Sequence, residues 1–180
     1  MTKKQEAWIF IFFQTALVIL MESIKTYKLN IFNTSISYSM FVIPFLLFLS
    51  HYITKKYNVR YALLGIFISG LVTLLFMIAM SFALGKVMIV GDYLGELLAY
   101  LVCQIINVAF YLYIINNTKE HKVIVLLNYI FSLLFFHIIY TLYYLNNIEL
   151  NNFWFKYILT IVLETIVLIP LTIIDKKIKK

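Results

Sequence analysis

Six long apolar stretches, separated by short polar breaks, make up nearly all of the chain. Each stretch has about the 20 residues that an α-helix needs to cross the hydrocarbon core of a bilayer. These runs predict helices over residues 7–24, 37–53, 61–84, 93–115, 123–145 and 155–174. We therefore expect an all-α integral membrane protein, in which residues 1–180 form a single domain of six transmembrane helices.

The basic residues are concentrated at one end of these predicted helices. Eleven of the Lys and Arg residues fall on the side of the two termini, and four fall on the opposite side. Because cytoplasmic loops carry the excess of Lys and Arg, we expect both termini in the cytoplasm. The eleven are Lys3, Lys4, Lys55, Lys56, Arg60, Lys119, Lys122, Lys176, Lys177, Lys179 and Lys180, and the four are Lys25, Lys28, Lys86 and Lys156.

Composition excludes a water-soluble globule. Hydrophobic residues make up 63% of the chain and charged residues 13%, whereas soluble domains carry about 25% charged residues. The net charge of +7 comes from lysines scattered at helix ends, so we expect the lipid bilayer as a partner and no nucleic acid. The first apolar run lacks a small-residue cleavage site, which favours a retained helix over a signal peptide. The expected location is a bacterial cytoplasmic (cell) membrane, in a multi-pass topology.

Small side chains recur every four residues in the predicted helix 61–84. Gly65, Ser69 and Thr73 share one face of that helix. Such a face lets a neighbouring backbone approach closely. It is consistent with packing inside the bundle or with docking against another membrane protein.

Polar residues inside the predicted helices are the best indication of function. Glu164 lies near the middle of helix 155–174, where a carboxylate costs on the order of 3 kcal/mol. It must therefore face the bundle interior, a cavity or a partner. Lys156, Thr160 and Thr172 extend the same stripe.

Three other predicted helices carry polar residues on one face. His137 lies on the opposite face of its helix from Asn128 and is expected to contact a neighbouring helix, and His51 is expected at the membrane interface. The stripes consist of Glu96, Tyr100, Gln104 and Asn107 in helix 93–115, Gln14 and Glu22 in helix 7–24, and Asn128 and Ser132 in helix 123–145.

Two interpretations of these stripes remain open. The groups can hydrogen-bond across helices and hold the bundle together, each contact contributing about 0.6 kcal/mol. Alternatively, they line a ligand pocket that opens toward the outside, because intramembrane ionisable residues are usually functional. The residues predicted to contact a ligand are Glu164, Gln104, Asn107, Glu96, Tyr100, Gln14 and Asn128.

The side chains suggest how a ligand is recognised. Glu164 would accept hydrogen bonds from a ligand N–H, or carry a proton if transport is coupled to protons. The amides of Gln104 and Asn107 would read a base-like edge with paired donors and acceptors. Tyr100 would stack on a flat ring.

No catalytic or nucleotide-binding motif occurs in the sequence. H-E-x-x-H, G-x-S-x-G and G-x-x-x-x-G-K-[ST] are all absent, and the histidines and the one cysteine lack the spacing of a metal site. We therefore expect no enzyme activity, no metal and no cofactor. Transport against a gradient would need an ion gradient or an energising ATPase with transmembrane partner subunits.

Three segments carry a resemblance to a known family. Residues 44–51 run from Pro-Phe to Ser-His, residues 99–108 contain Ala-Tyr with Gln104 and Asn107, and residues 132–141 end in Tyr-Thr. They resemble segments of the vitamin-uptake transporter family, whose characterised members import 7-deazaguanine queuosine precursors in bacteria. That family has Asp at the positions of His51, Asn107 and Tyr140. The resemblance implies a six-helix fold and the uptake of a vitamin- or nucleobase-like micronutrient.

Two further protein classes have a similar helix number. The substrate-binding subunits of energy-coupling-factor vitamin importers dock onto a shared transmembrane subunit with two ATPases. Their Ala-x-x-x-Ala docking pattern is not found here, and the face of Gly65, Ser69 and Thr73 is a possible substitute. The alternative function is that of a membrane scaffold subunit of a bacterial cell-shape or cell-wall complex. Such a scaffold transports nothing and uses polar stripes as lateral interfaces.

Overall fold

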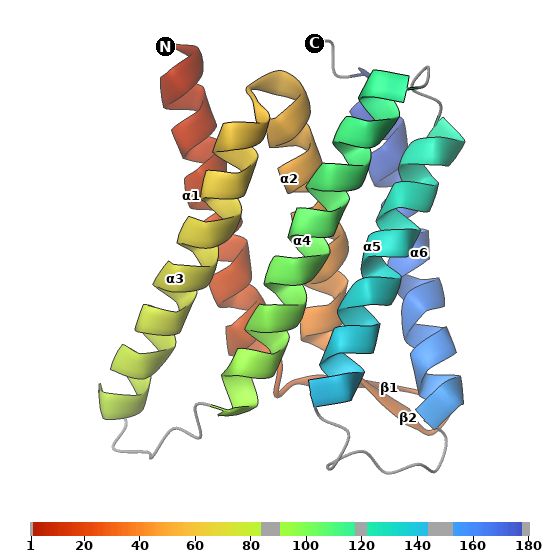
Figure 1. The fold of residues 1–180 in the computed structure, drawn as a ribbon. Helices are drawn as coiled ribbons and strands as arrows, with labels where there is room; N and C mark the ends of the chain where they lie inside the picture. Colours follow the sequence, from red (N-terminus) through yellow and green to blue (C-terminus); the bar gives the residue numbers. More distant parts are fainter. Residues whose placement is uncertain (1, 84–90, 118–121, 144–152, 178–180) are drawn as a thin grey trace.

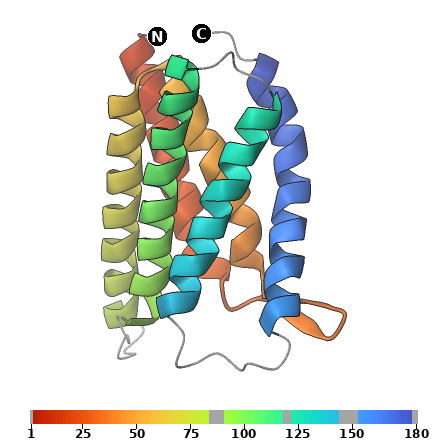
Figure 2. The same cartoon turned by 45° about the vertical axis from the view of Figure 1, so that its right-hand side comes forward.

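The computed structural model describes residues 2–83, 91–117, 122–143 and 153–177. These residues form a bundle of six α-helices with a two-stranded β-hairpin at one end (Figure 1). Successive helices run in opposite directions, so α1 begins and α6 ends at the same end of the bundle (Figures 1 and 2). The elements are α1 (Lys3–Ile24), β1 (Lys28–Ile31), β2 (Thr34–Ser37), the 3-10 helix η1 (Tyr38–Val42), α2 (Ile43–Lys56), α3 (Val59–Ala83), α4 (Gly91–Asn117), α5 (Lys122–Tyr143) and α6 (Phe153–Lys177).

Among the described helices, five are long and apolar enough to cross a membrane: α1, α3, α4, α5 and α6. Their outer faces expose large apolar side chains, and Phe12, Phe67 and Trp154 are 77%, 56% and 72% exposed. A soluble monomer rarely exposes such large contiguous apolar surface. Helices bond all their interior backbone groups within themselves, as lipid requires. The prediction of an all-α membrane protein is confirmed to this extent.

The second helix is shorter than predicted. The sequence suggested a helix over residues 37–53, but Ser37 ends β2 and α2 begins only at Ile43, after η1. Pro44 lies in the first turn of α2, where its missing N–H breaks no helical hydrogen bond. The Ser37 hydroxyl caps η1 by accepting a hydrogen bond of 3.2 Å from the Ser39 amide. With 14 residues, α2 does not reach the length of the five spanning helices.

The β-hairpin between α1 and η1 was not predicted. Its strands pair Lys28 with Ser37 and Ile31 with Thr34, which leaves a two-residue turn. The turn residues Phe32 and Asn33 both have positive φ, at 48° and 60°. A turn with two such residues matches the right-handed twist of the strands, and it usually contains Asn-Gly or Asp-Gly rather than Phe-Asn. The usual sequence signal of a hairpin is therefore missing here.

The other helix boundaries lie close to the predictions. Helix α1 begins at Lys3 instead of residue 7, because Thr2 and Gln5 form a reciprocal capping box. Helix α4 spans Gly91–Asn117 and α6 spans Phe153–Lys177, so each extends beyond its predicted range at both ends. Residues 84 and 145, where the third and fifth helices were expected to end, lie outside the described residues.

Helix α2 forms the centre of the bundle and contacts each of the other five α-helices. Around it, α1 packs closely on α3, and α4 on α5. The small-residue face of α3 lies inside the bundle, since Gly65, Ser69 and Thr73 are all buried. Of the two interpretations of this face, packing within the bundle is therefore the one that the structure supports.

Gly65 marks the close approach of α3 to α1. A Cβ atom at this position would lie 2.7 Å from Gln14 Oε1 and 3.2 Å from Ile11 Cγ1. We expect Gly65→Val to lower the free energy of unfolding by about 1–3 kcal/mol, because the side chains of Gln14 and Ile11 must shift to relieve the overlap. Thermal unfolding in detergent measures this loss. Leu64→Val places the same residue one position away, where the side chain is 40% exposed, and should have little effect; equal losses in both variants would contradict the packing argument.

Candidate functional site

All seven predicted ligand contacts lie inside the bundle. Glu96 and Asn128 are 3% exposed, and the other five are fully buried. Burial agrees with the inward direction of the stripes, but it does not separate a ligand pocket from a structural core. The contacts of each residue make that distinction possible. They divide the seven residues among four separate clusters rather than one site.

The amide cluster joins α2, α4 and α5 through Ser50, Gln104, Asn107 and Asn128. Asn107 Nδ2 donates to the Leu47 carbonyl at 2.9 Å and to Ser50 Oγ at 3.1 Å. Asn128 Nδ2 donates to Asn107 Oδ1 at 2.8 Å, and the Ser50 hydroxyl donates to Gln104 Oε1. Three helices are therefore connected by side-chain hydrogen bonds, which in lipid face little competition from water.

The tyrosine cluster joins α1, α3 and α4. Gln14 Nε2 donates to the Tyr100 hydroxyl at 3.0 Å, and Ser69 Oγ lies 2.8 Å from the same hydroxyl. The Tyr100 ring is completely buried, and its polar end is fully engaged. This arrangement places Tyr100 as a contact between helices, and its predicted stacking on a ligand stays a prediction.

The acid–imidazole cluster joins α5 and α6. His137 Nε2 lies 2.6 Å from Glu164 Oε2, and both side chains are buried. The expectation that His137 contacts a neighbouring helix is confirmed. The rest of the Glu164 stripe is less polar than its sequence indicates, because the Thr160 and Thr172 hydroxyls bond to carbonyls of their own helix. Of the described stripe residues, Glu164 is therefore the one for which the structure shows a hydrogen bond to another helix.

The acidic cluster lies at the hairpin end of the bundle and contains Glu22 and Glu96. Lys25 Nζ lies 3.1 Å from Glu22 Oε2. Glu96 hydrogen-bonds with the Ser39 side chain and interacts electrostatically with Glu22 and Lys25. The sequence placed Glu22 with Gln14 on one face of the first helix. It did not indicate that the turn of η1 brings Ser39 against Glu96.

His51 was placed wrongly by the sequence. It was expected at the membrane interface, near the basic end of α2, but its side chain is completely buried. His51 Nδ1 lies 2.7 Å from the Tyr129 hydroxyl, and the ring meets the edge of Tyr111. The reason is the central position of α2, whose surface is covered by other helices even near its end. The available signal in the sequence was that His51 directly follows Ser50 at the end of an apolar run, which could have indicated a pair of buried polar residues.

Five of the seven predicted residues keep one buried polar atom without a hydrogen-bond partner among the described residues. Such atoms cost about 1–3 kcal/mol each, and native structures hold few of them without a reason. Asn107 and Tyr100 have partners for their polar atoms. The five unpaired atoms are Gln14 Oε1, Glu96 Oε1, Gln104 Nε2, Asn128 Oδ1 and Glu164 Oε1.

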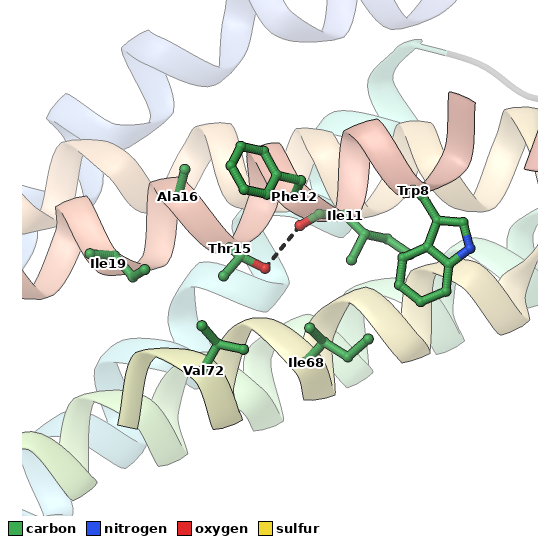
Figure 3. A pocket seen from close by; sticks show the side chains of 8 residues that line it. All are labelled: Trp8, Ile11, Phe12, Thr15, Ala16, Ile19, Ile68 and Val72. Carbon is green, nitrogen blue, oxygen red and sulfur yellow. Dashed lines mark hydrogen bonds between the residues drawn. The ribbon is translucent and has the colours of Figure 1, made fainter. Parts of the chain in front are cut away.

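A groove between α1 and α3 is a different kind of surface. Its volume is about 300 Å³, and it is lined by Trp8, Phe12 and Ile19 of α1 and by Ile68 and Val72 of α3 (Figure 3). The Thr15 hydroxyl in this lining bonds to the Ile11 carbonyl of its own helix at 3.0 Å. The groove therefore offers an apolar surface of the kind that lipid covers, and it contains none of the seven predicted residues.

The amide cluster makes a specific prediction about stability. We expect Asn107→Ala to lower the free energy of unfolding by about 1–2 kcal/mol, because it removes contacts to α2 and α5 that are worth about 0.6 kcal/mol each. A double-mutant cycle with Asn128→Ala measures the direct contact, and a coupling near 0.6 kcal/mol is expected. Thr165→Ala serves as the control, since its hydroxyl bonds only to its own helix. Strict additivity of the Asn107 and Asn128 losses would show that the bond contributes nothing.

Comparison with protein-family models, with curated proteins and with solved structures finds no match for this chain. The resemblance to the vitamin-uptake transporters therefore stays a prediction that rests on three short segments. The argument for a function comes from the buried side chains themselves, and in particular from the polar atoms that the bundle leaves without a partner.

Proposed function

We propose that the protein is a small-molecule membrane transporter, or the substrate-binding subunit of one, that imports a vitamin- or nucleobase-like micronutrient. The observation that carries this proposal is the set of unpaired polar atoms on α1, α4, α5 and α6. In a bundle with a purely structural role, each unpaired atom would lower the stability by about 1–3 kcal/mol without any compensating contact. A polar ligand that enters the bundle gives them partners.

The chemical types of the unpaired atoms support a heteroaromatic ligand. Gln104 Nε2 is a donor, whereas Gln14 Oε1, Asn128 Oδ1 and Glu164 Oε1 are acceptors. Within the amide cluster, Gln104 Nε2 and Asn128 Oδ1 offer one donor and one acceptor, which a flat base with a carbonyl and a ring N–H group would complement. A 7-deazaguanine queuosine precursor belongs to this class, as the resemblance of the three segments implies. Glu164 Oε1 supplies an acceptor that a ligand with N–H groups would satisfy and an apolar ligand would not.

Six membrane crossings with cytoplasmic termini form part of this proposal. Helix α2 has 14 residues and a length of about 21 Å, and the five residues of η1 add about 10 Å. Together they match the hydrocarbon core of about 30 Å. The excess of Lys and Arg at the end where α1 begins and α6 ends supports a cytoplasmic location for that end, in the bacterial cell membrane that the proposal assumes. The hairpin end then faces outward.

Energy coupling is constrained by the small-residue face of α3. Gly65, Ser69 and Thr73 are buried within the bundle, so they do not offer the docking surface that an energising transmembrane partner would need. If ATPase subunits take part, they must dock on another surface. An ion gradient requires no such surface, and the chain contains no nucleotide-binding motif of its own.

The second candidate is the scaffold of a cell-shape or cell-wall complex, and the amide cluster favours it. The side chain of Asn107 has all its polar atoms bonded inside the bundle, as a purely structural residue would. If the protein is a scaffold, small ligands should leave its stability unchanged. If it is a transporter, its ligand should raise that stability.

A thermal-shift screen of the detergent-purified protein against purines, deazapurines and vitamins tests the transporter. A ligand at about 100 times its Kd stabilises the folded state by about 2.7 kcal/mol, so one compound class should raise the Tm in a concentration-dependent way. Gln104→Leu and Glu164→Gln should abolish the shift. Glu6→Gln makes the same chemical change as Glu164→Gln at the start of α1, and it should keep the shift. A flat response of folded protein to the whole panel would favour the scaffold instead.

A further inference from the structure

The acidic cluster at the hairpin end contains more buried negative charge than its described surroundings neutralise. Glu22 is 2% exposed and Glu96 is 3% exposed. Oε1 of Glu22 and Oε1 of Glu96 lack a hydrogen-bond partner among the described residues. The ion pair with Lys25, at 3.1 Å, is the contact that neutralises Glu22. Two carboxylates thus face one ammonium group.

The other described elements packed around the cluster do not supply the missing charge among the residues that the structure describes. Ser39 of η1 bonds to Glu96 but is neutral. Tyr140 of α5 interacts with both carboxylates and carries no positive charge. Lys28 of β1 and Lys156 of α6 repel one another electrostatically, and both side chains lie exposed on the outside of the bundle. Neither of these two lysines forms a close ion pair with Glu22 or Glu96 in the described structure.

An unneutralised charge in this position is unfavourable. Removing a carboxylate from water costs several kcal/mol unless a partner compensates for it. Two carboxylates near each other avoid this cost when one of them takes up a proton. The protonated group then donates a hydrogen bond, and the remaining negative charge is balanced by Lys25. The number of charges in the cluster therefore sets the number of protons that it binds.

We propose that Glu22 and Glu96 together form a binding site for one exchangeable proton at the hairpin end of the bundle. A water molecule or hydronium ion at that end transfers H⁺ to a carboxylate oxygen, which becomes a carboxylic acid, and the reverse transfer returns it. With the orientation of the proposed function, on which this step rests, the proton comes from outside the cell. Uptake of the micronutrient is then driven by the proton gradient.

The same site connects to the hairpin by hydrogen bonds. Ser39 Oγ lies 2.8 Å from Ser37 Oγ at the end of β2, and Ser37 Oγ donates to the Lys25 carbonyl at 2.8 Å. Hydrogen bonds therefore link the Glu96 carboxylate, through Ser39 and Ser37, to β2 and to the backbone carbonyl of Lys25 at the end of α1. When Glu96 takes up a proton, its carboxylate becomes a weaker acceptor for the Ser39 hydroxyl. The bond between Ser39 and Ser37 links this change to the hairpin.

Infrared difference spectroscopy of the purified full-length protein tests the site without any transported ligand, because protonated carboxyl groups and carboxylates absorb at different frequencies. Glu22→Gln and Glu96→Gln each leave one carboxylate and one ammonium, so each should lose one protonated-carboxyl signal at neutral pH. Lys25→Gln leaves two carboxylates without a counter-ion and should gain one such signal. Glu6→Gln, at the start of α1, should match the parent.

These opposite signs separate a shared proton from a general loss of structure, since a misfolded variant has no reason to gain a signal. The proposal is overturned if Glu96→Gln and Glu22→Gln keep the parent spectrum. It is also overturned if sodium chloride, compared with choline chloride, converts the protonated signal to carboxylate, because the site then holds sodium. The spectra do not depend on the ligand screen, so a proton site in a protein with no ligand response would contradict the transporter alone.

Discussion

The arrangement of this bundle depends on one short helix whose surface is mostly covered by the other helices. Helix α2 contacts all five other α-helices, and most of its residues are buried. Because no water is available in a hydrocarbon core, each polar group on such a helix must find a partner on its neighbours. Ser50 does so with Gln104, and the Leu47 carbonyl accepts an additional bond from Asn107. This requirement explains why α4 and α5 turn polar side chains toward α2.

The features that the sequence predicts well are those that lipid imposes directly. Runs of about 20 apolar residues are necessary for spanning helices, and α1, α3, α4, α5 and α6 lie close to their predicted ranges. The hairpin was missed because its turn places Phe32 at φ 48°, a conformation that costs a residue with a Cβ about 1–2 kcal/mol. Tertiary contacts, rather than local preference, must therefore stabilise it, and a single sequence does not record them.

The candidate site was predictable in its residues but not in its pairing. Helical periodicity identifies one face of α4, and the burial of Glu96, Gln104 and Asn107 agrees with it. It does not say which helix covers that face. The bond between His137 and Glu164 joins a stripe residue to a histidine that the sequence placed outside the stripe of its own helix. Likewise, Glu22 and Ser39 meet Glu96 only because α1 and η1 pack beside α4, which is a property of the complete bundle.

The degree of hydrogen bonding differs from one buried polar residue to the next. Near the middle of the helices, Asn107 and Tyr100 are fully paired and connect the helices to one another. Glu164 and Glu96 each keep an oxygen that no described residue bonds. Carboxylates are the groups whose burial without partners costs the most, so a bundle optimised only for stability would have paired them first. Only part of the polar set is paired in that way: Gln14, Gln104 and Asn128 each keep one unpaired amide atom among the described residues, as Glu96 and Glu164 each keep one carboxylate oxygen.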